Sequence, residues 1–158
     1  MTESYLSMMM DSLDKKIDVL KRIEEENVRQ REALSADTVD TDAFEATVDA
    51  KGALIEELDQ LNEGFDSLFA KVKEELDGRK DLYKEQIAAM QEKIRTISAL
   101  SGSIQAEEIR NKALAEKSFQ KSRNDMIQGK KSARAALDYY RNMARSTFTP
   151  PQYLDSKN

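Results

Sequence analysis

Large apolar residues recur along residues 42–76 at alternating intervals of three and four positions, provided that two polar residues are counted in the same series. The series runs through Phe44, Val48, Lys51, Ile55, Leu58, Asn62, Phe65, Phe69, Val72 and Leu76. This spacing places the side chains on one face of a helix. An isolated helix cannot bury such a face, so the flanking segments must pack on it. The pattern therefore predicts that residues 42–76 form the helix around which the rest of the chain is arranged.

A similar apolar series precedes it and predicts a first helix over about residues 3–34. Its members are Leu6, Met9 or Met10, Leu13, Ile17, Leu20 and Ile23, followed after a gap by Val28 and Leu34. The gap, residues 24–27, is polar and predicts weaker packing at this level. Residues 8–10 are three consecutive Met residues, so at least one must be exposed on the helix and could contact a partner.

Residues 35–42 form the clearest predicted loop, because Ser, Thr and Asp are concentrated there between two periodic segments. Thr41 or Asp42 is the predicted cap of the following helix, and the two helices would be antiparallel neighbours. The carboxylates of the loop could instead indicate a calcium-binding site. However, Glu45 stands where an EF-hand loop counted from Asp40 requires glycine, so the capping role is favoured.

Gly78 marks the next boundary, between Leu76 and a further apolar series. That series consists of Tyr83, Ile87, Met90, Ile94 and Ile97. A single glycine is unfavourable in a helix but need not end it. We therefore expect a kink or a short break at Gly78, without a long loop.

Residues 101–103, Ser-Gly-Ser, are a stronger helix-ending signal, and Ser103 is the predicted N-cap of a fourth helix with Glu107 and Glu108 in its first turns. The apolar residues of that helix would be Ile104, Ile109, Leu114, Phe119, Met126, Ile127, Leu137 and Tyr140. Their spacing is less regular than in the preceding segments.

The composition favours long helices packed side by side. Of 158 residues, 39% are hydrophobic and 35% are charged, with only five Gly and two Pro. Such a chain offers narrow apolar stripes rather than broad layers. We expect an all-α fold, an elongated and coiled-coil-like antiparallel bundle of three to four long helices. Residues 1–146 would form a single domain and residues 147–158 an extended or disordered tail.

The sequence carries no signal for secretion or for a membrane span. The first twenty residues lack a basic region followed by an apolar run, and nowhere do about 18 apolar residues follow one another. The chain has no Cys, which excludes disulfides and permits a reducing compartment. These features predict a cytoplasmic protein.

The side chains on which most catalytic and metal sites depend are missing, since the chain has neither His nor Cys. Carboxylates are abundant, but runs such as residues 24–26 and 56–59 are typical of solvated helix faces. No glycine-rich phosphate-binding loop is present. We therefore expect no enzymatic activity, no cofactor and no metal.

Charge is distributed unevenly along the chain. Residues 1–100 carry 14 basic and 24 acidic side chains, whereas residues 101–158 carry 11 basic and 6 acidic ones. A basic last helix lying on acidic neighbours would be held in register by this difference. The basic residues near Tyr139 and Tyr140 could instead bind nucleic acid. Because the whole chain is acidic and its cations are spread around the helix, we expect no nucleic-acid partner.

The C-terminal region contains the strongest candidates for a binding site. Aromatic residues are concentrated in the last twenty residues, and Pro150 and Pro151 would keep the tail extended. Large apolar groups on such a tail either fold back on the bundle or bind a partner. The predicted partner-binding residues are Leu137, Tyr139, Tyr140, Met143, Phe148, Tyr153 and Leu154.

Three segments together resemble the FlgN-like family of bacterial flagellar export chaperones. The first is a run consisting of Asp40, Asp42, Phe44, Val48, Lys51, Leu54, Ile55, Glu57, Leu58 and Leu61. The others are residues 109–114, Ile-Arg-Asn-Lys-Ala-Leu, and the Tyr139–Tyr140 pair before a polar tail. The resemblance covers most of the chain.

This resemblance implies a cytosolic, non-enzymatic protein that binds the hook-filament junction proteins FlgK and FlgL before type III export, chiefly through its C-terminal helix. Components of the export apparatus are further possible partners. In one alternative, the chain is a FliT-like chaperone that binds the filament cap protein. A structural coiled-coil protein that only associates with itself is an alternative of a different class.

Overall fold

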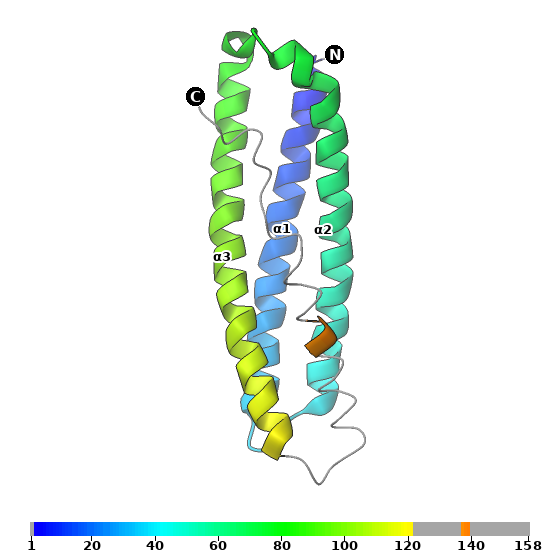
Figure 1. Ribbon diagram of the computed structural model, residues 1–158, viewed down its shortest axis with the longest axis vertical. Coiled ribbons are helices and arrows are strands. Elements are labelled where there is room, and N and C mark those ends of the chain that lie inside the picture. Colours follow the sequence, from blue (N-terminus) through cyan, green and yellow to red (C-terminus); the bar gives the residue numbers. More distant parts are fainter. Residues whose placement is uncertain (1, 122–136, 140–158) are drawn as a thin grey trace.

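The computed structural model of the chain describes residues 2–121 and 137–139, and these form an elongated helical bundle (Figure 1). The elements are α1 (Thr2–Ser35), α2 (Thr41–Leu76), a short 3-10 helix η1 (Lys80–Tyr83) and α3 (Lys84–Lys121). The three long helices run antiparallel to their neighbours in sequence. Within the described residues there is no strand, so the predicted all-α, elongated antiparallel bundle is confirmed.

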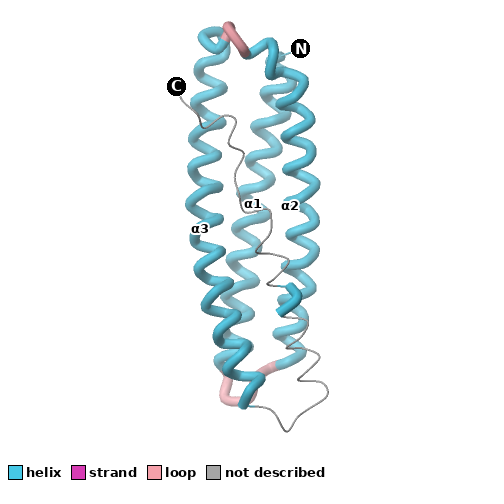
Figure 2. The backbone as a smooth tube through the Cα atoms, in the orientation of Figure 1, coloured by secondary structure: helices cyan, strands magenta, loops and turns pink. Residues whose placement is uncertain are grey.

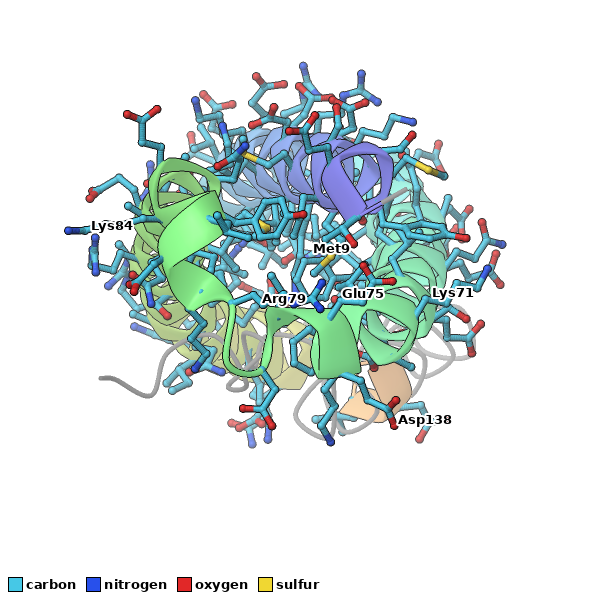
Figure 3. All side chains as sticks on the ribbon, turned by 90° about the horizontal axis from the view of Figure 1, so that it is seen from above. Met9, Lys71, Glu75, Arg79, Lys84 and Asp138 are labelled. Atoms are coloured by element: carbon cyan, nitrogen blue, oxygen red, sulfur yellow. The ribbon has the colours of Figure 1, made fainter. Side chains whose placement is uncertain are left out.

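Helix α1 is the central element, because α2 and α3 each pack along it much more extensively than on one another. Figure 1 shows α1 behind the other two helices, and the view from above in Figure 3 shows the same arrangement. The prediction that residues 42–76 organise the chain is therefore wrong. Helix α1 also has the widest buried face, in which the consecutive pairs Val19–Leu20 and Ala33–Leu34 are buried. A helix with two packed neighbours needs such a face.

The buried positions of α1 follow alternating steps of four and three along its whole length. They include Thr2, Leu6, Met9, Leu13, Lys16, Leu20, Ile23, Asn27, Gln30 and Leu34. The predicted stripe is correct as far as Ile23 except at one step, where Lys16 is buried and the predicted Ile17 is only partly buried. Beyond it, Asn27 and Gln30 continue the stripe, whereas Val28 is exposed. Within the predicted polar gap, residues 24–27, Asn27 is thus buried in the interface, and Glu25 is exposed.

The turn between α1 and α2 spans residues 36–40, inside the predicted loop. Asp40 is the N-cap of α2, and its side-chain oxygen accepts a hydrogen bond of 3.0 Å from the backbone N–H of Ala43. Its own N–H donates to the carbonyl of Ala33, at 3.2 Å. The predicted cap at Thr41 or Asp42 is therefore wrong by one or two positions. Asp42 lies in the first turn of α2, where its charge complements the helix dipole.

The chain reverses direction around Gly78, which confirms the predicted short break. Helix α2 ends at Leu76, and Gly78 adopts a positive φ of 81°, a conformation that glycine tolerates far better than other residues. The N–H of Arg79 donates to the carbonyl of Leu76 at 3.1 Å, and η1 then leads into α3. Figure 2 shows the two turns at opposite ends of the bundle.

Helix α3 continues through residues 101–103, so the predicted helix end there and the fourth helix beginning at Ser103 are wrong. The buried residues of α3 form one uninterrupted series of Met90, Ile94, Ile97, Ser101, Ile104, Glu108, Asn111 and Ala115. Ser101 thus occupies a core position, and Gly102 and Ser103 are exposed on the outer face. Ile109, assigned to the apolar stripe, is 70% exposed, and Glu108 takes its place in the core.

The core consists of two hydrophobic clusters. The larger one contains most of the buried apolar residues of all three helices, from Leu6 and Leu76 at one end to Ile23, Leu58 and Ile104. The smaller one contains Ala33, Leu34, Phe44 and Ala115. Polar side chains fill the interior between these clusters, and they position the candidate site.

Candidate partner-binding surface

A layer of buried polar side chains crosses the bundle between the two clusters. We call it the polar layer; it consists of Asn27 and Gln30 from α1, Thr47 and Lys51 from α2, and Glu108 and Asn111 from α3. Each of these residues lies at a position of the heptad pattern that is apolar elsewhere along the helices. The three helices therefore meet here through hydrogen bonds and charge rather than through hydrocarbon.

The ammonium of Lys51 is the centre of the polar layer, and its side chain is fully buried. Lys51 Nζ donates to Asn27 Oδ1 at 2.7 Å and to Gln30 Oε1 at 2.9 Å. It also forms a short hydrogen-bonded ion pair with Glu108 Oε1. The three acceptors match the three N–H donors of a protonated lysine. The geometry is thus that of a charged ammonium on α2 that donates hydrogen bonds to acceptors on both α1 and α3.

The remaining polar atoms of the layer are mostly paired with one another. Asn111 Nδ2 donates to the backbone carbonyl of Asn27 at 3.0 Å and to Gln30 Oε1 at 3.1 Å. Gln30 Nε2 donates to Thr47 Oγ1 at 3.2 Å, and that hydroxyl donates to the carbonyl of Phe44 at 2.6 Å. Such pairing offsets the cost of burying polar groups.

Burial shifts the ionisation of the Lys51–Glu108 pair in opposite directions. Desolvation lowers the pKa of Lys51, and the carboxylates of Glu108, Glu107 and Glu26 act against this shift. Desolvation likewise raises the pKa of Glu108, against the attraction of Lys51. Each charge therefore depends on the other for its stability inside the bundle.

Another buried lysine, Lys16, joins α1 to α2 nearer the other end of the bundle. Its Nζ donates to Asn62 Oδ1 at 2.7 Å. Burial lowers the pKa of Lys16 to about 8, with the carboxylate of Asp66 opposing the shift. The two polar positions noticed in the apolar series of residues 42–76, Lys51 and Asn62, are thus both positions of buried polar contact.

Residues 137–139 lie on the face of the bundle away from α1, beside α2 (Figures 1 and 3). Tyr139 is half-buried and packs against both hydrophobic clusters. Its ring centroid lies 4.8 Å from Lys51 Nζ, within the range of a cation–π interaction. Leu137 is 38% exposed, and Asp138 points outward in Figure 3. The bundle thus holds the tyrosine while the leucine remains accessible.

The structure therefore describes two of the predicted partner-binding residues, Leu137 and Tyr139, and brings both to one face of the bundle. The other five lie outside the described residues; they are Tyr140, Met143, Phe148, Tyr153 and Leu154. The predicted tail, residues 147–158, also lies outside them. That any of these residues bind a partner stays a prediction.

Further apolar side chains are exposed on the described helices. Met8 is 51% exposed, which confirms that at least one residue of the methionine run faces outward, and Leu82 on η1 is 71% exposed. A shallow hollow between α1 and α2 is lined by Met8, Asp11, Ser12, Lys15, Gln60, Leu61, Gly64 and Leu68. Met8 is thus both exposed and part of this hollow.

The described residues, 2–121 and 137–139, contain neither a candidate metal-ion site nor a candidate membrane span. No group of three or more acidic side chains there is arranged to hold a metal ion. None of the described helices combines the length and the apolar character that a membrane crossing requires.

The chain was compared with known proteins in three ways. No protein-family model matches it, and neither a curated protein nor a solved structure is significantly similar.

Proposed function

We propose that this chain is an export chaperone of the FlgN-like kind, which binds helical terminal segments of FlgK- or FlgL-like hook-filament junction proteins in the cytosol before type III export. The observation that carries the proposal is the placement of Leu137 beside Tyr139. The tyrosine ring is held by the bundle, and the leucine next to it is exposed. A docking segment requires such a fixed and accessible apolar group, because pre-organisation reduces the entropy lost on binding.

The protein would act by shielding apolar surface of the client from water, without a chemical reaction. Segments that pair only in an assembled filament would expose apolar stripes beforehand, and such stripes promote aggregation. An amphipathic helix of the client could pack its apolar stripe on Leu137 and on the predicted contacts that follow it. Both apolar surfaces would then be shielded from water. The complex must dissociate at the export gate, which favours moderate affinity.

The composition of the bundle supports a protein partner over other classes. Residues 2–121 carry 18 basic and 27 acidic side chains, a net charge of minus nine, which opposes the approach of a nucleic acid. The absence of His and Cys from the sequence removes the commonest general base and nucleophile. We therefore propose a non-enzymatic protein without a nucleic-acid partner.

Two alternatives make different demands on the surface. A FliT-like chaperone would use the same segment for the filament cap protein instead of a junction protein. A self-associating structural protein would instead bury exposed apolar residues such as Met8 and those of the α1–α2 hollow against a second copy.

Titration of the purified intact chain with FlgK-like, FlgL-like and filament cap proteins, followed calorimetrically, tests the proposal. We expect Leu137→Ala to weaken binding to one of the junction proteins at least tenfold without changing the melting temperature, because Leu137 is exposed. Changing Tyr139 and Tyr140 together to Ala should also weaken binding at least tenfold, with helical content retained.

Leu82→Ala is the matched control, since Leu82 is an exposed leucine on η1 at the end of the bundle. It should leave affinity unchanged. Tight binding of the filament cap protein alone would favour the FliT-like alternative. Self-association in sedimentation experiments, with none of the three clients bound, would overturn the chaperone proposal.

A further inference from the structure

The contact between Lys51 and Tyr139 joins the C-terminal region to the most polar part of the core. Lys51 belongs to α2 and Tyr139 is far from it in sequence, yet the ring centroid lies 4.8 Å from the ammonium nitrogen. The negative face of an aromatic ring attracts a cation at this distance, and the attraction is stronger when water is excluded. Lys51 is fully buried and Tyr139 half-buried, so this contact is largely desolvated.

The position of the ammonium is fixed by the helices, not by the tyrosine. Its hydrogen bonds to Asn27, Gln30 and Glu108 tie it to α1 and α3, although the lysine itself belongs to α2. Glu26 and Glu107 add further negative charge nearby, which favours the protonated form. The cation is therefore present in a defined place whether or not a ring covers it.

The tyrosine is also suited to this place by its apolar surroundings. Tyr139 packs against the larger and the smaller hydrophobic cluster, which the polar layer separates. Phe44 and Phe119 form an edge-to-face pair in the smaller cluster, with ring centroids 5.5 Å apart, so aromatic packing from α2 and α3 borders the same region. A flat ring can cover the polar layer and touch hydrocarbon on both sides of it.

We propose that Lys51 is a positioning residue for the C-terminal docking segment: its ammonium fixes the ring of Tyr139 on the bundle, and this orients Leu137 toward the partner. The assignment divides the predicted binding residues into two kinds. Tyr139 is an internal anchor, and Leu137 is a direct partner contact. The orientation of Leu137 toward a client rests on the proposed function, whereas the anchoring of Tyr139 does not.

A spectroscopic experiment on the intact protein without any client tests the anchor. The Lys51 side-chain methylene protons next to Nζ, observed by NMR, should be shifted upfield by the ring current of Tyr139. Tyr139→Leu should abolish this shift, and Tyr139→Phe should keep it because the ring remains. Lys16 is the matched control, as a buried lysine in another part of the bundle whose Nζ binds Asn62. Lys51 resonances that do not change in Tyr139→Leu would overturn the proposal.

A double-mutant cycle measures the same contact through the unfolding equilibrium. Each single variant, Lys51→Met and Tyr139→Leu, changes the unfolding equilibrium constant by some factor. The double variant should change this constant by a factor at least fivefold smaller than the product of those two factors. Lys16→Met combined with Tyr139→Leu should show independent effects. If Lys51→Met does not fold, the cycle is measured in chains that also carry Glu108→Met, which removes the carboxylate left without a counterion. Independent effects of Lys51 and Tyr139 would contradict the anchor.

Client affinity then separates this inference from the proposed function. With a FlgK- or FlgL-like protein, Tyr139→Phe should bind as the natural chain does, and Tyr139→Leu should bind at least fivefold more weakly. An observed ring-current shift without binding of any client would leave the anchor in place and remove the chaperone function. Equal affinity of the Phe and Leu variants for a bound client would remove the positioning role.

Discussion

Lys51 on α2 and Glu108 on α3 form an ion pair across the interior of the bundle, and their side chains are 0% and 9% exposed. Because each charge is desolvated, either residue would destabilise the folded protein if its partner were removed. The pair also connects α2 and α3, which pack more extensively on α1 than on one another.

Lys51→Met should destabilise the protein by about 3 to 5 kcal/mol, because Glu108 would remain buried without its counterion. Unfolding by urea, followed by circular dichroism at pH 7, measures this. Lys93→Met is the control, since Lys93 pairs with Asp14 on the surface at 2.6 Å, and its loss should cost at most about 1 kcal/mol. Adding Glu108→Met to Lys51→Met should recover much of the stability. Similar costs for Lys51→Met and Lys93→Met would contradict a buried pair.

The stability of the protein should depend on pH through Lys16. Its pKa is lowered from 10.5 to about 8 in the folded chain, so between these values the unfolded chain binds more protons at this site. Folding therefore becomes more favourable as pH rises from 8 to 10.5, and the charged lysine is a cost at pH 7. Relative to Lys16→Met, the natural chain should gain roughly 2 to 3 kcal/mol across this range.

Chemical denaturation of both variants at several pH values between 7 and 10.5 checks this gain. Lys21→Met is the control because Lys21 is exposed on the same helix, and its difference from the natural chain should stay constant. A constant difference for Lys16→Met as well would show that Lys16 is solvated in the folded protein.

Asp40→Ala should reduce stability by about 1 kcal/mol, because the backbone N–H of Ala43 loses its side-chain acceptor at the start of α2. Asp37→Ala changes the charge of the same turn at an exposed position and should have a smaller effect. Melting temperatures of the two variants, measured together, distinguish a capping role from a general charge effect. A larger loss from Asp37→Ala would contradict the assignment of the cap.

Two glycine substitutions should act in opposite directions, although a methyl group meets no atom within 4 Å at either position. Gly78→Ala should cost about 1 to 2 kcal/mol because its φ is positive. Gly102→Ala should stabilise α3 by roughly 0.5 to 1 kcal/mol, because alanine favours a helix interior. Denaturation curves measure both. A loss of stability from Gly102→Ala would indicate that α3 is broken at residues 101–103.

The apolar pattern was sufficient to predict α1, α2 and the two turns that follow them, but it wrongly divided α3 at residues 101–103. Large side chains such as Leu13, Leu58 and Ile94 recur at helical spacing, and each is buried where the pattern places it. The sequence was sufficient to select Leu137 and Tyr139 as candidate binding residues. It did not predict that Leu137 is exposed and Tyr139 half-buried. That difference depends on how residues 137–139 pack on the bundle, where Tyr139 contacts both hydrophobic clusters.

The errors have a common physical cause. Asn27, Ser101 and Glu108 continue the heptad positions, but a search for apolar periodicity treats them as interruptions. The burial of Asn27 and Glu108 is offset by partners on other helices, because Lys51 binds both of them. A sequence-based signal was present in the spacing itself, since these polar residues keep the alternation of three and four. The central place of α1 was missed because its wider face becomes evident only when both neighbours are known.

The unbroken seven-residue repeat of α1 has a geometric consequence. A straight α-helix has 3.6 residues per turn, so a stripe with a period of 3.5 drifts by about 20° per heptad and stays on its neighbours only if the helices wind around one another with a left-handed twist. Adding or deleting one residue in the middle of α1 would rotate everything beyond it by about 100° and turn either the hydrocarbon end or Asn27 and Gln30 toward water. The length of this bundle can therefore change without loss of register only in whole heptads.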